Sequence, residues 1–395
     1  MLASAWLLFF VTVELLLEIR PLTLNDLGPL TQIPYFAYRK DYRSDPDLVF
    51  VYRHTNVIWR QTFLGDLFPR DSKLPPHPLE YVESNGPDGF RINSSPPPYD
   101  LAVIGDSFIQ WGENDASTFP ELLKRETGLS TRNLGRGFYG PYQYLEVLKR
   151  FVLVGKPKFA LLSFFGGNDF ADIEQYQRWL SGGNYYSYRD LDGGGFLGRF
   201  ATASRETLQF LLEAAASSWV SIAEAFEQNV YRLTLGGENV AMAFGYWERP
   251  VTEAQAAGFG AILDEFTALC EHHQIIPIFM YIPSAVQVYG RLVKDPQNEY
   301  LRALAIRDFD PSRAAFAAVL AARGLEYTDL TPVFKAEADA GRLVFHPFDT
   351  HWNLHGRQVA AAAVAAALRR HDRKTPAEDP FILMAQESAT TESSP

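Results

Sequence analysis

The feature that most constrains the fold is an apolar run that ends abruptly in glycine and a polar turn, and the chain has it twice. Residues 99–104 form one such run before Gly105, and residues 161–165 form the other before Gly166. Short apolar runs closed by glycine are typical of buried strands. Residues 118–126, which follow the first run, are helical in pattern. This succession of buried strand, turn and helix predicts an α/β fold built on a parallel sheet.

Ser107 follows the first apolar run in the sequence Gly-Asp-Ser-Phe, so it should lie in the turn between the strand and the helix. Ligands of open α/β sheets bind at this carboxyl edge, and a helix N-terminus favours developing negative charge. For a lone Gly-Asp-Ser, the simpler interpretation is that Asp106 or Ser107 caps the helix. A nucleophilic serine is favoured because further motifs accompany it.

Two loops and one C-terminal pair supply those motifs. The loop 133–141 holds three glycines, which can bring backbone N–H groups close to a ligand, and Asn168 follows the second predicted strand. Either loop alone is more often a plain turn. Asp349 and His351 stand two positions apart, and in an extended segment such residues point the same way. A serine, a carboxylate and an imidazole are the parts of an acyl-transfer enzyme.

In this order, over about residues 100–370, the motifs resemble the four sequence blocks of the SGNH (GDSL-type) hydrolases. The resemblance implies a three-layer, flavodoxin-like parallel sheet and a serine esterase or acyl hydrolase that acts on an O-acyl ester. Ser107 resembles the nucleophile, and Asp349 and His351 resemble the rest of its triad. The groups that resemble the oxyanion hole are the backbone N–H groups of Ser107 and of Gly137 or Phe138, and the side-chain amide of Asn168.

The last block departs from the usual Asp-x-x-His of these hydrolases. Its Asp-x-His-Trp form is similar to that of extracytoplasmic polysaccharide O-acyltransferases related to the alginate acetylation proteins. O-acyl transfer to a cell-surface polysaccharide is therefore an alternative to hydrolysis of a carbohydrate ester. A non-catalytic carbohydrate-binding or assembly protein on the same fold is an alternative of another class. The α/β-hydrolase fold is disfavoured, because Ile109 replaces the second glycine of its Gly-x-Ser-x-Gly elbow.

Composition narrows the range of partners. A formal net charge of −11 argues against a nucleic-acid surface. No Cys/His cluster has zinc spacing, so we expect neither a metal nor an organic cofactor. The N-terminus is apolar from Leu2 to Val13, and Glu14 interrupts it short of a full span of about 20 residues. We expect a membrane anchor or signal there. Basic residues follow the apolar stretch, which by the positive-inside rule would put that side in the cytoplasm. The resemblance implies the opposite, a catalytic domain outside the cytoplasm.

The chain divides by composition into four parts. Residues 1–20 are the expected anchor or signal, and 21–99 are an extension packed on the core, in which we expect Arg91 to form a surface ion pair. Residues 100–372 are the SGNH-like catalytic domain, with an insertion at about 171–237 that we interpret as a lid or binding wall. Strands are expected at 240–246 and 275–282, around a helix at 253–272. Residues 373–395 are rich in Glu, Ser and Thr and are predicted to be disordered.

Overall fold

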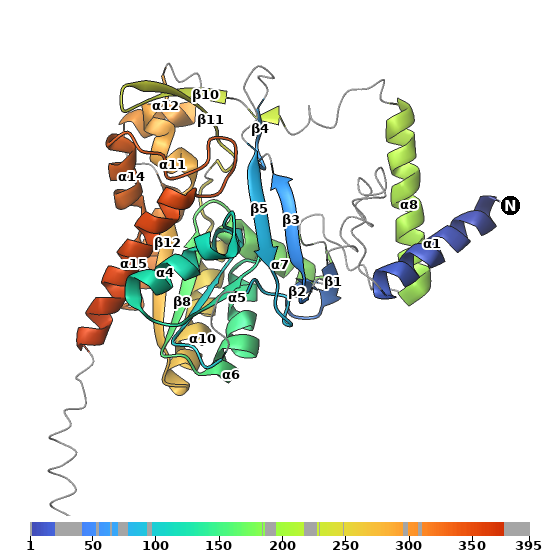
Figure 1. The fold of residues 1–395 in the computed structure, drawn as a ribbon, viewed down its shortest axis with the longest axis horizontal. Coiled ribbons are helices and arrows are strands. Elements are labelled where there is room, and N and C mark those ends of the chain that lie inside the picture. The colour runs from blue at the N-terminus through green and yellow to red at the C-terminus, as the bar shows by residue number, and fades with distance from the viewer. Residues whose placement is uncertain are drawn as a thin grey trace, which may run out of the picture.

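The fold is taken from a computed structural model of the chain (Figure 1). It describes residues 2–19, 42–52, 55–63, 65–69, 78–92, 97–183, 185, 195–216, 227–228, 230–247, 249–294, 299–306 and 310–374. The predicted disordered tail lies almost entirely outside the described residues, since the last described helix ends at Lys374.

A five-stranded sheet forms the centre of the molecule, and each of its strand pairs is parallel. Its strands are β6 (Leu101–Gly105), β7 (Thr131–Gly135), β8 (Phe159–Phe165), β12 (Ile276–Ile282) and β13 (Thr328–Asp329). They lie in the order β13-β12-β8-β6-β7. Counted along the chain this is the order 2-1-3-4-5 of flavodoxin-like folds, so the predicted fold class is confirmed.

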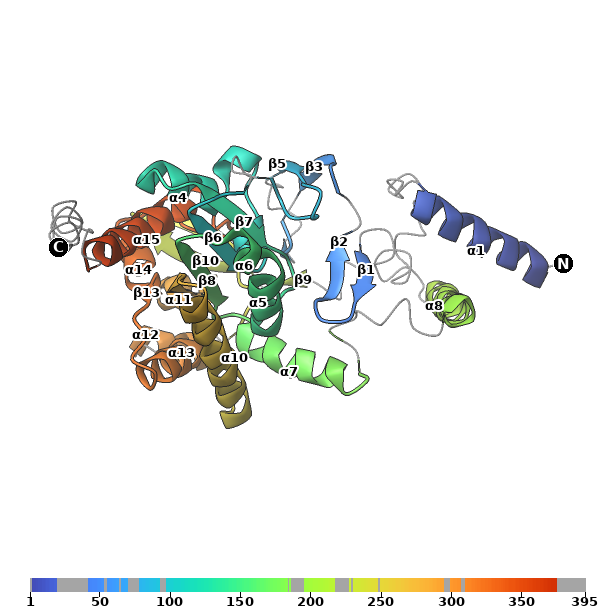
Figure 2. The same cartoon turned by 90° about the horizontal axis from the view of Figure 1, so that it is seen from below.

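Helices cover both faces of the sheet, because successive residues of each buried strand point to opposite sides. Leu101 and Val103 of β6 face one apolar cluster, and Ala102 and Ile104 face the other. The first face is covered by α4 (Phe119–Thr127), α11 (Ala285–Tyr289), α14 (Thr331–Asp339) and α15 (Leu354–Lys374). The second is covered by α5 (Pro141–Val147), α7 (Asp169–Leu180), α10 (Glu253–His272) and α13 (Pro311–Ala321). Figure 2 shows α4 and α15 on the side of the sheet opposite α10 and α13.

Short elements connect these layers. They are α3 (Ser107–Gln110), η2 (Asp115–Ser117), η3 (Leu148–Val152), α6 (Leu153–Gly155), η4 (Gly290–Leu292) and α12 (Glu299–Ile306). The most consequential is α3, a single turn that directly follows β6 and carries Ser107 at its first position.

The described residues between 42 and 92 form short paired strands beside the carboxyl edge of the sheet. Strand β1 (Tyr42–Asp45) pairs with β2 (Val49–Tyr52), and β3 (Ile58–Phe63) pairs with β5 (Leu79–Ser84). Strand β4 (Phe68–Pro69) pairs in parallel with β9 (Glu227–Gln228). Arg91 is fully buried, where its guanidinium bonds to Asp115 and to the carbonyls of Gln110 and Gly112. The expected surface ion pair of Arg91 is therefore wrong, because the side chain ties the extension to the turn after α3.

One predicted strand takes a different place from that expected. Residues 240–246 were expected to continue the β/α alternation, but β11 (Glu238–Ala243) pairs antiparallel with β10 (Val230–Leu235) in a separate hairpin. The apolar pattern of this segment packs against the face that holds α14 and α15, through residues such as Met242 and Phe244. The expected strand at 275–282 and helix at 253–272 are present as β12 and α10.

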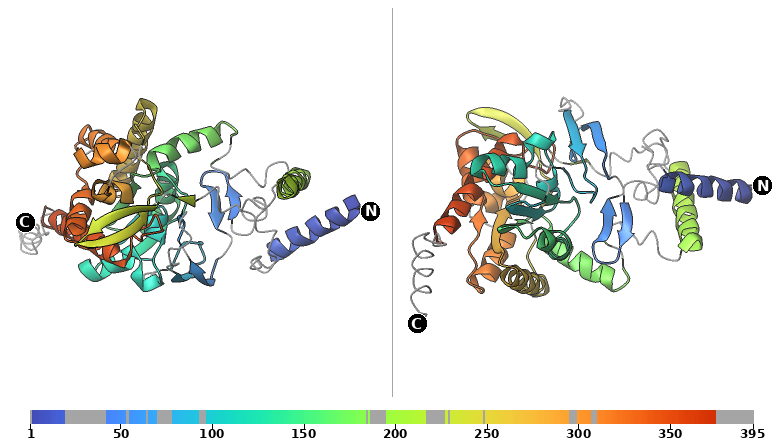
Figure 3. Two further views of the ribbon diagram at one scale, coloured as in Figure 1. Left: turned by 90° about the horizontal axis from the view of Figure 1, so that it is seen from above. Right: turned by 60° about the horizontal axis from the view of Figure 1, so that its bottom comes forward.

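Helices α1 (Leu2–Ile19) and α8 (Gly195–Ala216) lie against each other, apart from the sheet and its layers (Figure 3). Glu14 of α1 is buried and pairs with Arg199 of α8 at 3.0 Å, and the Trp6 indole donates to the Ser204 hydroxyl. Within the described residues, no helix has both the length and the apolar content needed to cross a membrane. The predicted spanning anchor is thus not supported.

Candidate active site

Ser107 lies at the carboxyl end of β6, in the first turn of α3. The Asp106 carboxylate caps this turn by accepting from the Phe108 N–H at 2.9 Å. Gly105 permits the sharp bend, since a Cβ there would lie 2.5 Å from Cγ1 of Ile109. The Ser107 N–H has no acceptor within the described part of the chain, because Ser107 is the first residue of the helix and the N–H groups of a first turn have no intrahelical acceptor. The capping interpretation thus holds for Asp106, and Ser107 faces a cavity.

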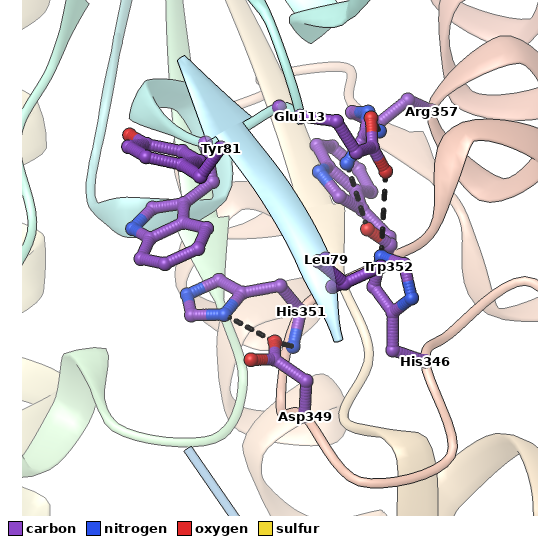
Figure 4. A pocket seen from close by; sticks show the side chains of 10 residues that line it. Leu79, Tyr81, Glu113, His346, Asp349, His351, Trp352 and Arg357 are labelled. Atoms are coloured by element: carbon purple, nitrogen blue, oxygen red, sulfur yellow. Dashed lines mark hydrogen bonds and ion pairs between the residues drawn. The ribbon is translucent and has the colours of Figure 1, made fainter. Parts of the chain in front are cut away.

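Asp349 and His351 form a buried pair on the loop before α15 (Figure 4). Oδ1 of Asp349 lies 2.6 Å from Nδ1 of His351 and also accepts from the backbone N–H of His351 at 2.8 Å. This double contact explains how a spacing of two residues brings the carboxylate to the ring. Because Nδ1 is bound to Asp349, Nε2 is the nitrogen that remains for a serine hydroxyl. No hydrogen bond joins Ser107 to His351 among the described contacts.

A second carboxylate, Asp66, lies beside this pair and comes from the N-terminal extension. Its backbone N–H donates to Oδ2 of Asp349 at 3.2 Å, and its Oδ1 accepts from the Thr350 N–H at 2.7 Å. The Leu67 N–H donates to the Phe348 carbonyl at 3.2 Å. We call residues 65–67 the strap, since they cross the loop 348–350 and hold the Asp349 carboxylate from the side opposite His351.

Gly65 allows the strap to cross so closely. Its φ of +95° is in the left-handed region, and a Cβ there would lie 2.1 Å from the Phe348 carbonyl oxygen. We expect Gly65→Ala to displace the strap and to lower kcat by roughly 100-fold, since a shift of about 1 Å in a catalytic group can cost that much. Gly324→Ala is a matched control: its φ is +65° and its Cβ would meet no atom within 4 Å. Equal losses in both variants, measured by steady-state kinetics, would contradict the role of the strap.

Carboxylates dominate the electrostatics of His351. Burial by itself lowers the pKa of the imidazole, but the charges of Asp349, Asp66 and Asp106 and the Asp349 hydrogen bond raise it to about 9. For Asp349, burial raises the pKa, and the charge and hydrogen bonds of His351 outweigh it and hold the pKa below its ordinary value. Burial raises the pKa of Asp106 to about 6. The ring and its carboxylates thus form an ion pair at neutral pH.

This ion pair sets the expected pH dependence of catalysis. A general base must be neutral, and His351 loses its proton only as the pH rises through about 9. We therefore expect kcat/KM to increase roughly 50-fold between pH 7 and pH 9 and then to level off, because each pH unit below the pKa changes the neutral fraction tenfold. Asp66→Asn should shift this rise to lower pH. A flat profile from pH 6 to pH 9, after correction for spontaneous ester hydrolysis, would rule out a base with this pKa.

Aromatic rings support the imidazole. The Trp111 ring stacks on His351 at a centroid distance of 5.0 Å and an interplanar angle of 11°, and Tyr81 follows at 4.6 Å from Trp111. Phe108 lies 5.1 Å from His351 on a tilted plane. Trp352 is fully buried behind the pair and donates to the Phe108 carbonyl at 3.1 Å, in agreement with a packing role. A ring face next to an imidazolium stabilises its charge.

The loop 133–141 brings Gly137 and Phe138 to the cavity. The Gly137 N–H donates to Oε1 of Gln110 at 2.7 Å, and Nε2 of Gln110 is bound in turn by the buried Glu83 carboxylate. Phe138 has a φ of +67°, and its carbonyl accepts from the Tyr185 hydroxyl. In this structure the Gly137 N–H is therefore already bonded to the side-chain carbonyl of Gln110.

Asn168 lies at the end of β8, where α7 begins. Its Nδ2 donates to Oδ2 of Asp172 at 2.8 Å, which fixes the plane of the amide and leaves its second N–H for a ligand. Asp169 is fully buried and accepts from the Tyr144 hydroxyl and the Phe165 N–H. Burial and the neighbouring carboxylates Asp106 and Asp172 raise the pKa of Asp169 far above its ordinary range.

A cavity of about 340 Å³ joins these groups. Its wall includes Ser107, Gly137, Phe138, Asn168 and His351 from the predicted site, and Tyr42, Tyr52, Asp66, Tyr81, Glu83, Gln110, Trp111 and Tyr246 besides. A second cavity of only about 10 Å³ lies behind His351, among Glu113, His346 and Arg357 (Figure 4). That volume holds about one water molecule, so of the two cavities beside His351 the one of about 340 Å³ has room for a substrate.

The sequence did not point to Asp66, Trp111 or Gln110. Trp111 lies four residues after Ser107, a spacing that could have placed it near the site if the turn were helical. Asp66 lies in a segment of no regular pattern, so no local signal marks it. His355 bonds to Glu337 at 2.6 Å and does not line the cavity.

One group of residues has the ligand types of a cation site. One ligand atom each of Asp66, Asp349 and His351 lie within 4.8 Å of one another. The same side chains, however, make the Asp349–His351 and Asp66–Thr350 hydrogen bonds, with which a cation would compete. The arrangement therefore suits an imidazolium between carboxylates better than a metal ion.

Comparisons with known proteins bear on the fold and the chemistry. Residues 271–393 match the family model described as the SGNH hydrolase-like domain of acetyltransferase AlgX. The resemblance predicted from the sequence is thereby confirmed. The matched region contains Asp349 and His351 but not Ser107, and it covers less than a third of the chain. The chain matches no curated protein.

Several solved structures are similar at low identity. A lipolytic protein of the G-D-S-L family from Desulfitobacterium hafniense is 12% identical, with a TM-score of 0.36 over 68% of this chain and 98% of that one. The lipase/acylhydrolase of Enterococcus faecalis is 14% identical, with a TM-score of 0.35 over 69% and 96%. The acetylxylan esterase Axe2 of Geobacillus stearothermophilus, as a catalytic mutant, is 10% identical, with a TM-score of 0.34 over 68% and 93%. At such scores the likeness says nothing of this protein's reaction or substrate.

Proposed function

We propose that this protein is a serine esterase that cleaves an O-acyl ester of a carbohydrate through Ser107, His351 and Asp349. The observation that carries the proposal is the Asp349–His351 pair, whose imidazole lines one cavity with Ser107 and Asn168 at the carboxyl edge of the sheet. The SGNH hydrolase-like match of residues 271–393 supports acyl-ester chemistry on this fold. The aromatic side chains of the cavity wall support a sugar substrate, because ring faces pack against sugar rings.

The chemistry would proceed in two acyl-transfer steps. Nε2 of His351 takes the proton of Ser107 as its hydroxyl attacks the ester carbonyl, and Asp349 holds the ring by Nδ1 and offsets the imidazolium charge. The Ser107 N–H and the free N–H of Asn168 donate to the tetrahedral oxyanion. The protonated ring then gives its proton to the departing alkoxide, which leaves the acyl group on Ser107. In the second step His351 takes the proton of the acceptor as it attacks the acyl-serine, and returns it to the Ser107 oxygen as the bond between that oxygen and the acyl carbon breaks.

The nature of that acceptor separates two functions. Water as acceptor gives hydrolysis, and a sugar hydroxyl gives O-acyl transfer to a polysaccharide. The match to a domain of an acetyltransferase favours transfer as the second candidate. Incubation with an acyl donor and unacylated oligosaccharides, followed by mass spectrometry, distinguishes the two: esterified sugar indicates transfer, and free acid alone indicates hydrolysis.

Labelling with a fluorophosphonate probe tests the proposal itself. The wild-type chain should be modified at Ser107, with the site identified by peptide mass spectrometry, and Ser107→Ala should not react. An intact, folded chain that neither reacts with the probe nor turns over any ester would favour a binding or assembly protein on the same fold. The proposal places the catalytic domain outside the cytoplasm, as the resemblance implies; fractionation of cells tests that placement.

The Asn168 amide is expected to act on the transition state alone. Asn168→Ala should lower kcat by about 100- to 1000-fold with little change in KM, because the amide binds a charge that appears only in the tetrahedral intermediate. Initial rates over a range of substrate concentrations separate the two constants. A rise in KM at unchanged kcat would assign Asn168 to ground-state binding instead.

A further inference from the structure

The charge of the large cavity carries information about its substrate. Two carboxylates, Asp66 and Glu83, belong to its wall, and both come from the N-terminal extension. Asp66 accepts from the N–H and hydroxyl of Thr350, and Glu83 accepts from the Tyr81 hydroxyl and the Gln110 amide. All of these donors are uncharged. Within the described residues, neither carboxylate forms an ion pair with Lys or Arg.

On the described part of the cavity wall, the imidazolium of His351 is the one cation beside these carboxylates. Among the described residues that line it, none is Lys or Arg, and the single charge of His351 is shared between Asp349, at 2.6 Å, and Asp66, so the carboxylates outnumber the cation. The nearest guanidinium in the loop 133–141, that of Arg136, is buried over the Tyr52 and Phe90 rings and donates to the Gly89 carbonyl. It therefore lies behind the wall rather than facing the cavity.

Further carboxylates lie beneath the cavity floor. Asp106 and Asp172 are buried below Ser107 and Asn168. Asp169 is buried beside them, but its strongly raised pKa keeps it protonated, so it adds no charge. The effect of the charged carboxylates is visible at Tyr246 on the wall: burial raises the pKa of this phenol, and the charges of Asp66, Asp172 and Asp106 raise it further. Because the surroundings are of low dielectric, such charges are weakly screened. A carboxylate, sulfate or phosphate on a substrate would be repelled where it lies near the wall carboxylates Asp66 and Glu83.

From this arrangement we infer that the site selects a neutral acyl ester on a sugar unit that bears no carboxylate, sulfate or phosphate, and that Asp66 determines this selectivity. The inference rests on the proposed function, which it narrows to a substrate class. It places polyuronates outside the substrate range, and likewise acyl groups that carry a second carboxylate. Asp66 is the wall carboxylate that is both solvent-exposed and adjacent to His351, so an anionic substituent would meet it first.

The test compares two acetylated oligosaccharides of equal length, one of xylose and one of galacturonic acid. For the wild-type chain we expect kcat/KM for the neutral substrate to exceed that for the anionic one by about 10- to 100-fold, since opposing like charges costs a few kcal/mol. The ratio should fall with added salt. Asp66→Asn, which keeps the side-chain shape, should reduce the ratio several-fold, while Asp264→Asn, an exposed site on α10, is the control for net charge.

Binding to Ser107→Ala, measured by calorimetry, gives the same comparison without turnover. Tighter binding of the neutral oligosaccharide supports the inference even if no ester is cleaved. Equal or tighter binding of the galacturonate, or an unchanged ratio in Asp66→Asn, overturns it. Failure of the proposed function has a different signature, namely no probe labelling of Ser107 and no turnover of either substrate.

Discussion

Ser107→Ala and His351→Ala should each lower kcat by about 10⁶-fold while the chain stays folded. The remaining rate would come only from substrate binding and the oxyanion donors that are left. The physical reason is that the hydroxyl and the imidazole act as one unit: without the base the serine is not activated, and without the serine the base has no proton to take. Ester turnover under saturating substrate measures the loss, and circular dichroism checks the fold.

The double variant makes this test sharper. If the two residues act together, Ser107→Ala combined with His351→Ala should be no slower than either single variant. A double variant that is far slower than both would show independent contributions and would contradict the triad. Gly324→Ala again provides a variant remote from the cavity against which small losses can be judged.

Asp349→Asn should reduce kcat by up to about 10⁴-fold without unfolding the chain. An amide at this position can donate to Nδ1 of His351, which would put the ring proton on Nε2, the nitrogen that must accept from Ser107. It would also remove the charge that holds the pKa of His351 high, so the pH profile should shift to lower pH. The strap would keep its backbone contact, since the Asp66 N–H can donate to the amide oxygen.

Kinetics at several pH values check this prediction. The strongest contrary result would be near-wild-type turnover in a folded Asp349→Asn chain. Asp66 is then the acid to examine, because it is the other carboxylate whose charge raises the pKa of His351 from within the cavity wall.

Local sequence patterns predicted those site residues whose positions depend on neighbouring residues in the chain, namely Ser107, Asp349 and His351. The apolar run before Gly105 became the buried β6, and its abrupt end places Ser107 at the sheet edge. The two-residue spacing of Asp349 and His351 suffices because the His351 N–H turns back onto the same carboxylate. The order of the strands followed from the resemblance to SGNH hydrolases, not from the residues themselves.

Contacts between segments that are distant in the chain could not be predicted from the sequence. Asp66 meets Thr350 across 284 positions, and Tyr81 reaches His351 through Trp111. Neither contact needs a periodic pattern, so nothing local marks these residues. The strand at 238–243 shows a related limit: alternation predicts an extended segment, but its pairing with β10 depends on a turn at 236–237 rather than on the central sheet.

The strap has a consequence for how the protein is made. Because residues 65–67 leave the ribosome long before residues 348–350, the groove for the strap does not exist while most of the chain is being synthesised. Closing so long a loop is slow compared with forming a helix or a hairpin. A nascent or truncated chain that already has its sheet and its serine would therefore lack an aligned acid and base, and it would remain unreactive until its last segment folds.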